Sequence, residues 1–99
     1  MNYTPPIYEK EMISLIKEAV EVPDWQRIIL QLWIKDEVLT YNLEFIDKDG
    51  NRKKTIIWDT FELTCLFLHD KNREWNTIDM TISADGEVKS EYYFIQYLS

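Results

Sequence analysis

Two runs of alternating apolar and polar residues, joined by an Asp-Gly pair, constrain the fold of this chain most strongly. They span Trp75 to Tyr97, with Asp85-Gly86 between them. Side chains alternate between the two faces of a strand, so each run has one apolar and one polar face. Asp-Gly between such runs predicts a tight hairpin, because both central residues of a type I′ turn need φ > 0. The apolar side of this hairpin holds Ile78, Met80, Ile82, Val88, Tyr92 and Phe94.

A second alternating pair of segments lies upstream. Residues 25–35 and 38–46 each alternate with a period of two, and Asp36-Glu37 separates them as a short polar turn. They therefore predict another hairpin. A further turn follows at residues 47–50, where Gly50 would supply a positive φ. Residues 52–58 alternate less regularly and predict a weaker edge strand, whose basic run discourages pairing with other sheets.

Helical spacing is found in two segments. Residues 7–21 follow two prolines, precede Pro23 and carry one apolar face, so they predict an amphipathic helix. Residues 59–71 begin with Asp59 and Glu62 in the spacing of a capping box. We favour a helix there, with a strand as the alternative because Phe, Thr and Cys are mediocre helix formers. Its expected apolar face consists of Phe61, Cys65 and Leu68, widened by Leu63, Leu66 and Phe67.

These elements predict an α+β fold in the order α-β-β-(β)-α-β-β. We expect an antiparallel sheet of four to five strands, with the N-terminal helix and the second helix packed on one face. The 99 residues correspond to one domain, residues 1–99. A domain of this size buries only about 60–65% of its unfolded surface. The 45% hydrophobic content makes a well-packed core feasible.

The charge balance narrows the class of partner. There are 18 acidic residues against 11 basic ones, a net charge of −7 that is spread along the chain. Such a surface repels phosphate backbones, which argues against nucleic-acid binding. It suits a basic protein partner through electrostatic steering. The alternative is that the negative charge serves only to keep the protein soluble.

Several features predict a cytoplasmic protein. Cys65 is the only cysteine, so no intrachain disulfide can form, which fits a reducing compartment. The first residues, MNYTPPIYEKEM, lack the basic and apolar regions of a signal peptide. No apolar run approaches the ~18 residues that a membrane span requires, so no membrane association is expected.

Residues with catalytic potential are few. His69 is the only histidine, and it lies four residues after Cys65, so the two side chains could touch on a helix. We favour a structural role for both. A histidine near a helix end often caps carbonyls, and a buried thiol acts as a small apolar group.

Metal and phosphate sites fail on residue number or spacing. One cysteine and one histidine cannot supply a zinc site. Asp47 and Asp49 resemble the start of a calcium loop, but Gly50 occupies the fourth position instead of the sixth, and Trp58 occupies the twelfth. The chain has two glycines, too few for a phosphate-binding loop. No catalytic residue, cofactor or metal is therefore predicted.

The polar face of the predicted sheet collects acids and aromatic residues. The acids are Glu44, Asp79 and Glu91, and the aromatic residues are Trp33, Tyr93 and Tyr97. Tryptophan and tyrosine beside acids are typical of protein interfaces. Coverage by a further helix, or packing at a sheet edge, is the alternative that the sequence leaves open. Two carboxylates at about 5–9 Å could also form a hydrolase pair.

Three short segments, together with the order of the elements, resemble a known family. They are Glu74–Ile78, Ala84–Val88 and Tyr92–Phe94, and Asp24-Trp25 precedes the first hairpin. They are similar to the YezG-like family of small bacterial immunity proteins, or antitoxins. In that family a Trp-initiated strand, a glycine turn and a tyrosine-rich last strand follow the second helix. The resemblance implies a non-enzymatic protein that binds and neutralises a cognate toxin domain, often a nuclease, and it implies no catalytic residues.

We therefore expect an immunity protein whose partner is a basic toxin, blocked at its active or substrate-binding site. The first surface expected to bind the toxin holds Glu44, Asp79 and Glu91, with Trp33 and Tyr93 as anchors. The acidic turns with Asp36, Glu37, Asp47 and Asp49 are second candidates. Two alternatives remain: a non-enzymatic adaptor or homo-oligomeric interaction domain, and a small hydrolase that uses a carboxylate pair. The oligomeric state stays open.

Overall fold

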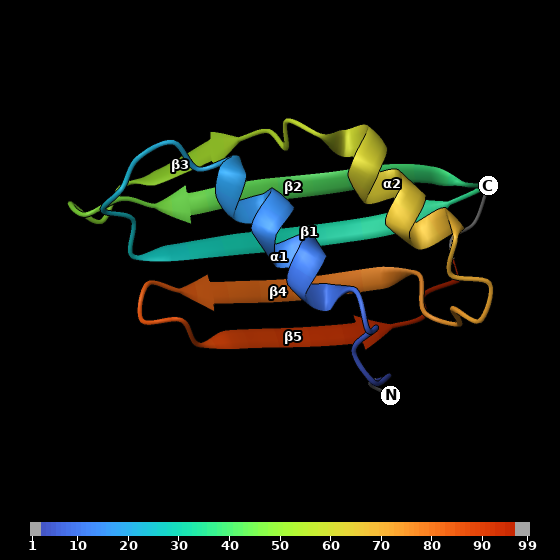
Figure 1. Cartoon of the computed structure of the whole chain (residues 1–99). Helices are drawn as coiled ribbons and strands as arrows, with labels where there is room; N and C mark the ends of the chain where they lie inside the picture. Colours follow the sequence, from blue (N-terminus) through green and yellow to red (C-terminus); the bar gives the residue numbers. More distant parts are fainter. Residues whose placement is uncertain (1–2, 97–99) are drawn as a thin grey trace.

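The computed structural model describes residues 3–96, which form a five-stranded antiparallel sheet with two helices on one face (Figure 1). The strand order is β3-β2-β1-β4-β5. In chain order the elements are α1 (Glu9–Glu18), β1 (Arg27–Lys35), β2 (Val38–Ile46), β3 (Arg52–Thr55), α2 (Thr60–Leu68), β4 (Thr77–Ser83) and β5 (Val88–Tyr93). The predicted α+β fold, its element order and the position of both helices are confirmed.

The core lies between the helices and the sheet. β1 and β4 occupy the centre of the sheet, and alternate residues of each point toward the helices. Ile28, Leu32 and Ile78 are completely buried there, as are Met12 and Ile16 of α1. Removing apolar surface from water is worth roughly 25 cal/mol per Å². The period-two pattern of the sequence therefore defines the face of the sheet that the helices cover.

Four aromatic rings connect the elements at one end of this core. Tyr8 packs edge-on against Phe67 of α2, with the ring centroids 6.0 Å apart. Phe67 packs in the same way against Trp75 at 5.6 Å. Trp75 in turn packs against Tyr92 of β5 at 5.0 Å. Such edge-to-face pairs contribute about 0.5–1.5 kcal/mol each beyond the area they bury. This aromatic ladder ties α1, α2 and β5 to the residue that precedes β4.

Both helices are shorter than predicted. α1 is Glu9–Glu18 and not residues 7–21, and α2 is Thr60–Leu68 and not residues 59–71. The second segment is a helix, so the strand alternative is wrong. It begins after Asp59, whose Oδ1 accepts a hydrogen bond from the backbone N–H of Glu62 at 2.9 Å. This is the bond that the predicted capping box requires on the side of Asp59.

The buried face of α2 differs from the predicted one. Leu63 and Phe67, which lie one turn apart, are buried, whereas Phe61 is 78% exposed. Leu68 is also exposed, and Cys65 is half-buried. The face predicted from Phe61, Cys65 and Leu68 is therefore wrong. Apolar residues surround most of this segment, so its spacing alone could not identify the stripe that faces the sheet.

Two strands are also shorter than predicted. β1 begins at Arg27 and not at residue 25, and β3 ends at Thr55 and not at residue 58. Thr55 Oγ1 donates a hydrogen bond to the carbonyl of Ala19 at 2.8 Å, and Ile57 is buried. The chain therefore leaves the sheet after Thr55 and enters the helix layer.

The turns are distributed differently from the prediction. Gly86 has φ 95°, whereas Asp85 is not among the residues with positive φ. Among the described residues other than glycine, positive φ is found at Asp36 (φ 52°) and Glu37 (φ 64°). The carbonyl of Ser83 accepts from Gly86 N, and Ser83 N donates to the carbonyl of Glu87. The predicted type I′ turn at Asp85-Gly86 is therefore wrong, because the loop there is longer and uses its glycine as a bulge. The two positive φ values of a type I′ turn are found at Asp36-Glu37 instead.

Candidate protein-binding surface

The sheet face opposite the helices, called the open face from here on, is left without a helix in residues 3–96 (Figure 1). Directly paired residues of an antiparallel sheet point to the same face. Ile29, Gln31 and Trp33 alternate with the buried residues of β1 and so point to the open face. The register adds Glu44 opposite Ile29, Asp79 opposite Gln31, Glu91 opposite Asp79, and Tyr93 opposite Thr77. The structure thus brings the first five predicted residues onto one face, while Tyr97 lies outside the described residues.

The aromatic residues form one end of the open face. Trp33 pairs with Thr77, which pairs with Tyr93 on the next strand. Thr77 is only 5% exposed, although no helix covers it. Tyr93 Oη donates a hydrogen bond to Asp79 Oδ2 at 2.8 Å, which fixes the carboxylate between the strands. A hollow of about 280 Å³ opens here, lined by Gln31, Trp33, Thr77, Asp79, Tyr93 and Ile95.

Glu44 is the carboxylate of the open face that already has a cationic partner. Arg52 Nη2 lies 2.7 Å from Glu44 Oε1 across the β2–β3 pair. This hydrogen bond is the main cause that holds the pKa of the Glu44 carboxyl below its ordinary value. The carboxylate therefore stays charged, but a cationic residue of any partner would have to compete with Arg52 for it. As an exposed pair, the two contribute little to stability.

The open face is not acidic as a whole. Within the described strands, its register holds three carboxylates, Glu44, Asp79 and Glu91, and five cationic side chains, Arg27, Lys35, Arg52, Lys54 and Lys89. The predicted acid-and-aromatic face is therefore wrong, because the strand register also places basic residues beside the acids. Most of the net charge of −7 must therefore lie elsewhere on the molecule.

A strongly acidic surface is formed where three connections meet at one end of the sheet. Gln26 joins them: its N–H donates to the carbonyl of Ile46 at 2.7 Å, its carbonyl accepts from Ala84 N at 3.0 Å, and its Nε2 donates to the carbonyl of Lys48 at 3.0 Å. Apart from Glu21, near the end of α1, the carboxylates carried by these connections are Asp24, Asp47, Asp49, Asp85 and Glu87. We call this set the acidic end. Sequence reasoning proposed only Asp47 and Asp49 of it, because the other three become neighbours only through the strand order.

Asp47 organises the β2–β3 turn of the acidic end. Its Oδ1 accepts hydrogen bonds from Asn51 N and Asp49 N, each at 2.9 Å, and its Oδ2 lies 3.4 Å from Lys53 Nζ. The backbone N–H of Asn51, more than any other group, holds the pKa of the Asp47 carboxyl below its ordinary value. Asp47 is therefore committed to the turn, whereas Asp49 is exposed.

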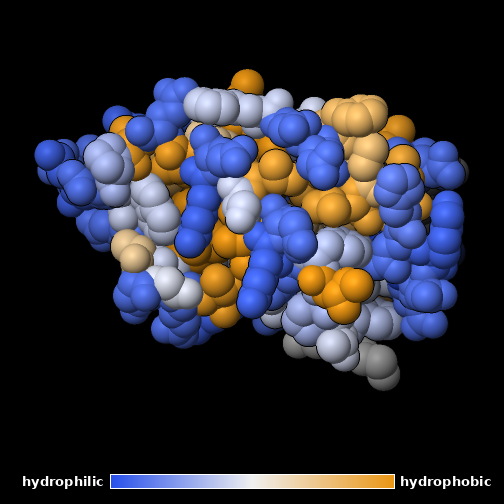
Figure 2. Space-filling view, viewed as in Figure 1, coloured by the Kyte–Doolittle hydropathy of each residue, from blue (hydrophilic) through white to orange (hydrophobic). Residues whose placement is uncertain are grey.

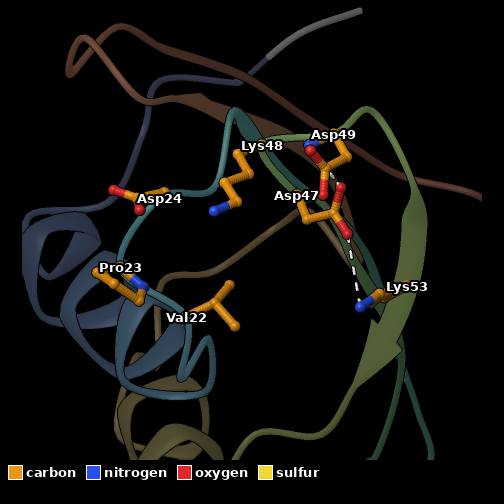
Figure 3. Close-up of a pocket in the computed structure, with 7 residues that line it drawn as sticks. All are labelled: Val22, Pro23, Asp24, Asp47, Lys48, Asp49 and Lys53. Atoms are coloured by element: carbon orange, nitrogen blue, oxygen red, sulfur yellow. Dashed lines mark hydrogen bonds and ion pairs between the residues drawn. The ribbon is translucent and has the colours of Figure 1, made fainter.

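The acidic end also contains a concave region. A hollow of about 280 Å³ lies between the α1–β1 connection and the β2–β3 turn. Figure 3 shows the Lys48 side chain extending toward the side where Asp24 lies, and the ion pair between Asp47 and Lys53 at the opposite wall. Its lining consists of Val22, Pro23, Asp24, Asp47, Lys48, Asp49 and Lys53.

The other predicted turn, Asp36-Glu37, lies far from the acidic end. It connects β1 to β2 at the opposite end of the sheet, and both residues are exposed. β1 has nine residues, and a strand rises about 3.4 Å per residue, so the two ends are about 30 Å apart. The structure therefore does not gather all nine predicted residues into one patch.

Comparison with known proteins does not identify a relative. No protein-family model matches the chain, and no curated protein matches it significantly. The functional interpretation therefore depends on the surfaces described above and on the resemblance found in the sequence.

Of the residues with catalytic potential, the structure pairs two carboxylates directly, whereas the histidine lies at a helix end. His69 is the C-cap of α2, where its backbone N–H donates to the carbonyl of Cys65 at 3.0 Å. Asp79 and Glu91 are direct partners across β4 and β5. In residues 3–96 no group of three or more His, Cys, Asp or Glu side chains could hold a metal ion.

None of the helices in the described part of the chain is long and apolar enough to span a membrane.

Proposed function

We propose that this chain is a YezG-like immunity protein, an antitoxin that acts in the cytoplasm by binding a cognate toxin domain and not by catalysis. The observation that carries the proposal is the open face, on which Trp33 and Tyr93 stand beside Asp79 without a covering helix. Tryptophan and tyrosine anchors of this kind dominate the energy of protein interfaces. The hydrogen bond from Tyr93 fixes Asp79 in advance, which lowers the entropy cost of binding.

The size of the open face indicates that the toxin also contacts one end of the sheet. Five strands spaced about 4.8 Å apart and about 23 Å long offer roughly 450 Å² of projected area. A standard protein interface buries about 800 Å² on each partner. The partner must therefore extend beyond the face, and the acidic end adjoins it directly.

Charge favours the acidic end over the Asp36-Glu37 turn as this second contact. Asp24, Asp49, Asp85 and Glu87 are exposed there, with Lys48 among them. A cluster of one sign steers an oppositely charged partner and raises the association rate. A nuclease that binds nucleic acid carries cationic groups in its substrate site. In this proposal the carboxylates of the acidic end take the place of phosphates, while the aromatic end of the open face supplies the apolar contact.

Co-expression tests the proposal. The protein encoded by the neighbouring reading frame is expressed with and without this chain, and bacterial growth is measured together with complex formation on a sizing column. Protection and a stable complex are expected. Trp33→Ala should weaken the complex by about tenfold or more, as expected for an anchor residue. A neighbouring protein that is harmless, or that forms no complex, would contradict the proposal.

Charge reversals separate the two parts of the surface. Asp49→Lys combined with Asp85→Lys should slow association and make it less sensitive to salt, because the steering charge is removed. Glu11→Lys combined with Glu18→Lys makes the same change in charge on the exposed side of α1 and serves as the control. Equal effects of the two pairs would mean that net charge matters and that the acidic end is not the contact.

The second candidate function is a homo-oligomeric interaction domain that uses the open face on a second copy. The mixed charges of that face favour it, because three carboxylates and five cations among the described residues can be self-complementary in a two-fold interface. Sedimentation of the pure protein distinguishes the two functions. A dimer that dissociates with Trp33→Ala supports self-association, whereas a monomer supports a different protein as the partner.

A further inference from the structure

One edge of the sheet is incomplete. β3 pairs only with residues Leu43–Ile46 of β2, and no strand of the described chain pairs with the outer edge of Val38–Asn42. Figure 1 shows β3 stopping partway along β2, after which the chain rises to α2. At the opposite edge of the sheet, Tyr3 N donates to the carbonyl of Tyr92 at 2.8 Å, so the N-terminal segment covers part of β5. Within the described residues, no backbone hydrogen bond of this kind is made to the outer half-edge of β2.

A hydrogen bond explains why the chain leaves this edge. Ile57 N donates to Tyr41 Oη at 2.9 Å. Tyr41 pairs with Leu32, which is completely buried, so its phenol points toward the helix layer. The backbone of Ile57 is therefore held above the sheet, at the far end of the Tyr41 side chain, and not beside β2. No strand within residues 3–96 therefore pairs with this part of the β2 backbone.

Three large exposed apolar side chains lie in the segment that leaves this edge, and the first of them, Ile56, lines a hollow together with Tyr41 and Asn42. Ile56 is 69% exposed, Trp58 is 61% exposed and Phe61 is 78% exposed, although the intervening Ile57 is buried. Figure 2 shows apolar side chains along the edge where β3 leads into α2. Single exposed apolar residues are normal on a protein surface. A group of them beside an unpaired strand edge is typical of an interaction site.

β3, which ends where this free half-edge begins, carries a charge opposite to that of the whole protein. Arg52, Lys53 and Lys54 are consecutive in β3 and all exposed. Arg52 and Lys53 contact Glu44 and Asp47, but exposed ion pairs of this kind are weak and exchange readily. Lys54 lies opposite Glu44, on the open-face side of the strand. A second copy that added its own β3 here would bring cations against cations.

We propose that the free half-edge of β2 binds an extended segment of another polypeptide, with alternating acidic and apolar residues, as an added strand. Its main chain pairs with Val38–Asn42, in line with β3. Side chains on the open-face side are acidic, because the residue opposite Asn42 comes two positions, or about 7 Å, from Lys54. Side chains on the other side are apolar and contact Ile56, Trp58 and Phe61. This is recognition by strand addition, in which main-chain bonds supply affinity and alternate side chains supply specificity.

A hollow marks the point of entry. It measures about 380 Å³, lies where β3 ends, and is lined by Tyr41, Asn42, Leu43, Lys54, Thr55 and Ile56. The lining therefore includes a basic residue (Lys54), an exposed apolar residue (Ile56) and two residues of the unpaired part of β2 (Tyr41 and Asn42). The proposal does not rest on the immunity function, since it uses a surface of opposite charge from the acidic end.

A fluorescein-labelled peptide, Asp-Val-Glu-Ile-Asp-Val-Glu, tests the site by fluorescence anisotropy. Saturable binding is expected, with protection from amide hydrogen exchange at residues 38–42. Trp58→Ala combined with Phe61→Ala should weaken binding by about tenfold. All these side chains are exposed, so the variants should keep the fold, which circular dichroism verifies. Ile7→Ala, which removes an even more exposed apolar side chain outside the site, should change nothing.

Charge exchange makes the test specific. Lys54→Glu should weaken binding of the acidic peptide and improve binding of Lys-Val-Lys-Ile-Lys-Val-Lys. The proposal is overturned if the acidic peptide fails to bind at about 1 mM, if both peptides bind equally to the unchanged protein, or if protection appears away from residues 38–42. A dimer in sedimentation that Trp58→Ala dissociates would assign the edge to a second copy and would also overturn it.

Discussion

The phenol of Tyr92 donates a hydrogen bond to Glu9 Oε2 and thereby joins the last strand to the start of the first helix. Ser90 Oγ donates to the same oxygen at 3.0 Å. The residue before Glu9 is fixed as well, because Tyr8 Oη donates to Asp70 Oδ2 at 2.9 Å. α1 has no side-chain hydrogen bond at its N-cap. Two tyrosine–carboxylate contacts hold the first turn of this helix on the sheet instead.

Removing the Tyr92 hydroxyl should destabilise the protein. Tyr92 is 1% exposed, and a hydrogen bond to a charged group contributes about 1.5–3 kcal/mol. Tyr92→Phe should therefore lower the free energy of unfolding by about 1–3 kcal/mol in urea titrations. Glu9→Ala should cost a similar amount, and the double variant should cost less than the sum. Glu11→Ala, an exposed change in the same helix, is the control. Additive losses would mean that the contact carries no coupling.

High pH should weaken the fold through the same tyrosine. Burial, followed by the hydrogen bond to Glu9, raises the pKa of Tyr92 above its ordinary value. The unfolded chain then releases the phenolic proton first, near pH 10. The stabilisation is complete below about pH 10 and declines above it, by about 1.4 kcal/mol per pH unit for one phenol.

The comparison of wild type with Tyr92→Phe isolates this effect. Lysines also titrate in this range, but they are the same in both proteins. The wild-type free energy of unfolding should fall more steeply between about pH 10 and about pH 11 than that of the variant. Burial also raises the pKa of Tyr8, so a smaller slope should remain in the variant. Parallel curves would show that Tyr92 does not titrate with unfolding.

The corrected face of α2 has a direct consequence for stability. Leu63 is completely buried whereas Phe61 is 78% exposed, two positions earlier in the same helix. Leu63→Ala should therefore cost about 2–5 kcal/mol, and Phe61→Ala less than about 0.5 kcal/mol. Thermal unfolding of both variants measures this. A larger loss for Phe61→Ala would restore the face expected from the sequence.

The strands were predictable because one face of the sheet is buried under the helices and the other is more exposed to solvent. In β4, Ile78 to Ile82 alternate cleanly with polar residues. In β1, the buried Ile28 to Ile34 alternate with the more exposed Ile29, Gln31 and Trp33, and both segments form strands. α2 was harder, since Leu, Phe and Cys occur around most of its circumference. The turns depended on local hydrogen bonds: Asp-Gly is compatible with several loops, and only the bond from Gly86 N to Ser83 selects one of them.

The candidate surfaces were only partly predictable for a related reason. The alternation predicts that Trp33 and Asp79 lie on one face, because each falls between the apolar residues of its own strand and side chains alternate between the two faces. It could not show that Arg52 would lie beside Glu44, since that depends on the register between strands. The acidic end depends on strand order as well, because Asp24, Asp49 and Asp85 are distant in the chain.

The Asp36-Glu37 turn should be improved by glycine. Glu37 has φ 64°, and a left-handed conformation costs a residue with a Cβ about 1–2 kcal/mol. Part of this is offset by the greater entropy of glycine in the unfolded chain. Glu37→Gly should therefore raise the free energy of unfolding by about 0.5–1 kcal/mol in urea titrations. Glu37→Ala removes the same charge but keeps the Cβ, so it should give no such gain.

The reverse change at Gly86 should have the opposite sign. Gly86 has φ +95°, and a Cβ added there would meet no atom within 4 Å. Steric contact therefore plays no part, and Gly86→Ala should cost about 1 kcal/mol through the backbone alone. A neutral Gly86→Ala, measured together with an inert Glu37→Gly, would show that positive φ carries no cost at these turns. In that case the acids at Asp36-Glu37 would not be held at the expense of stability.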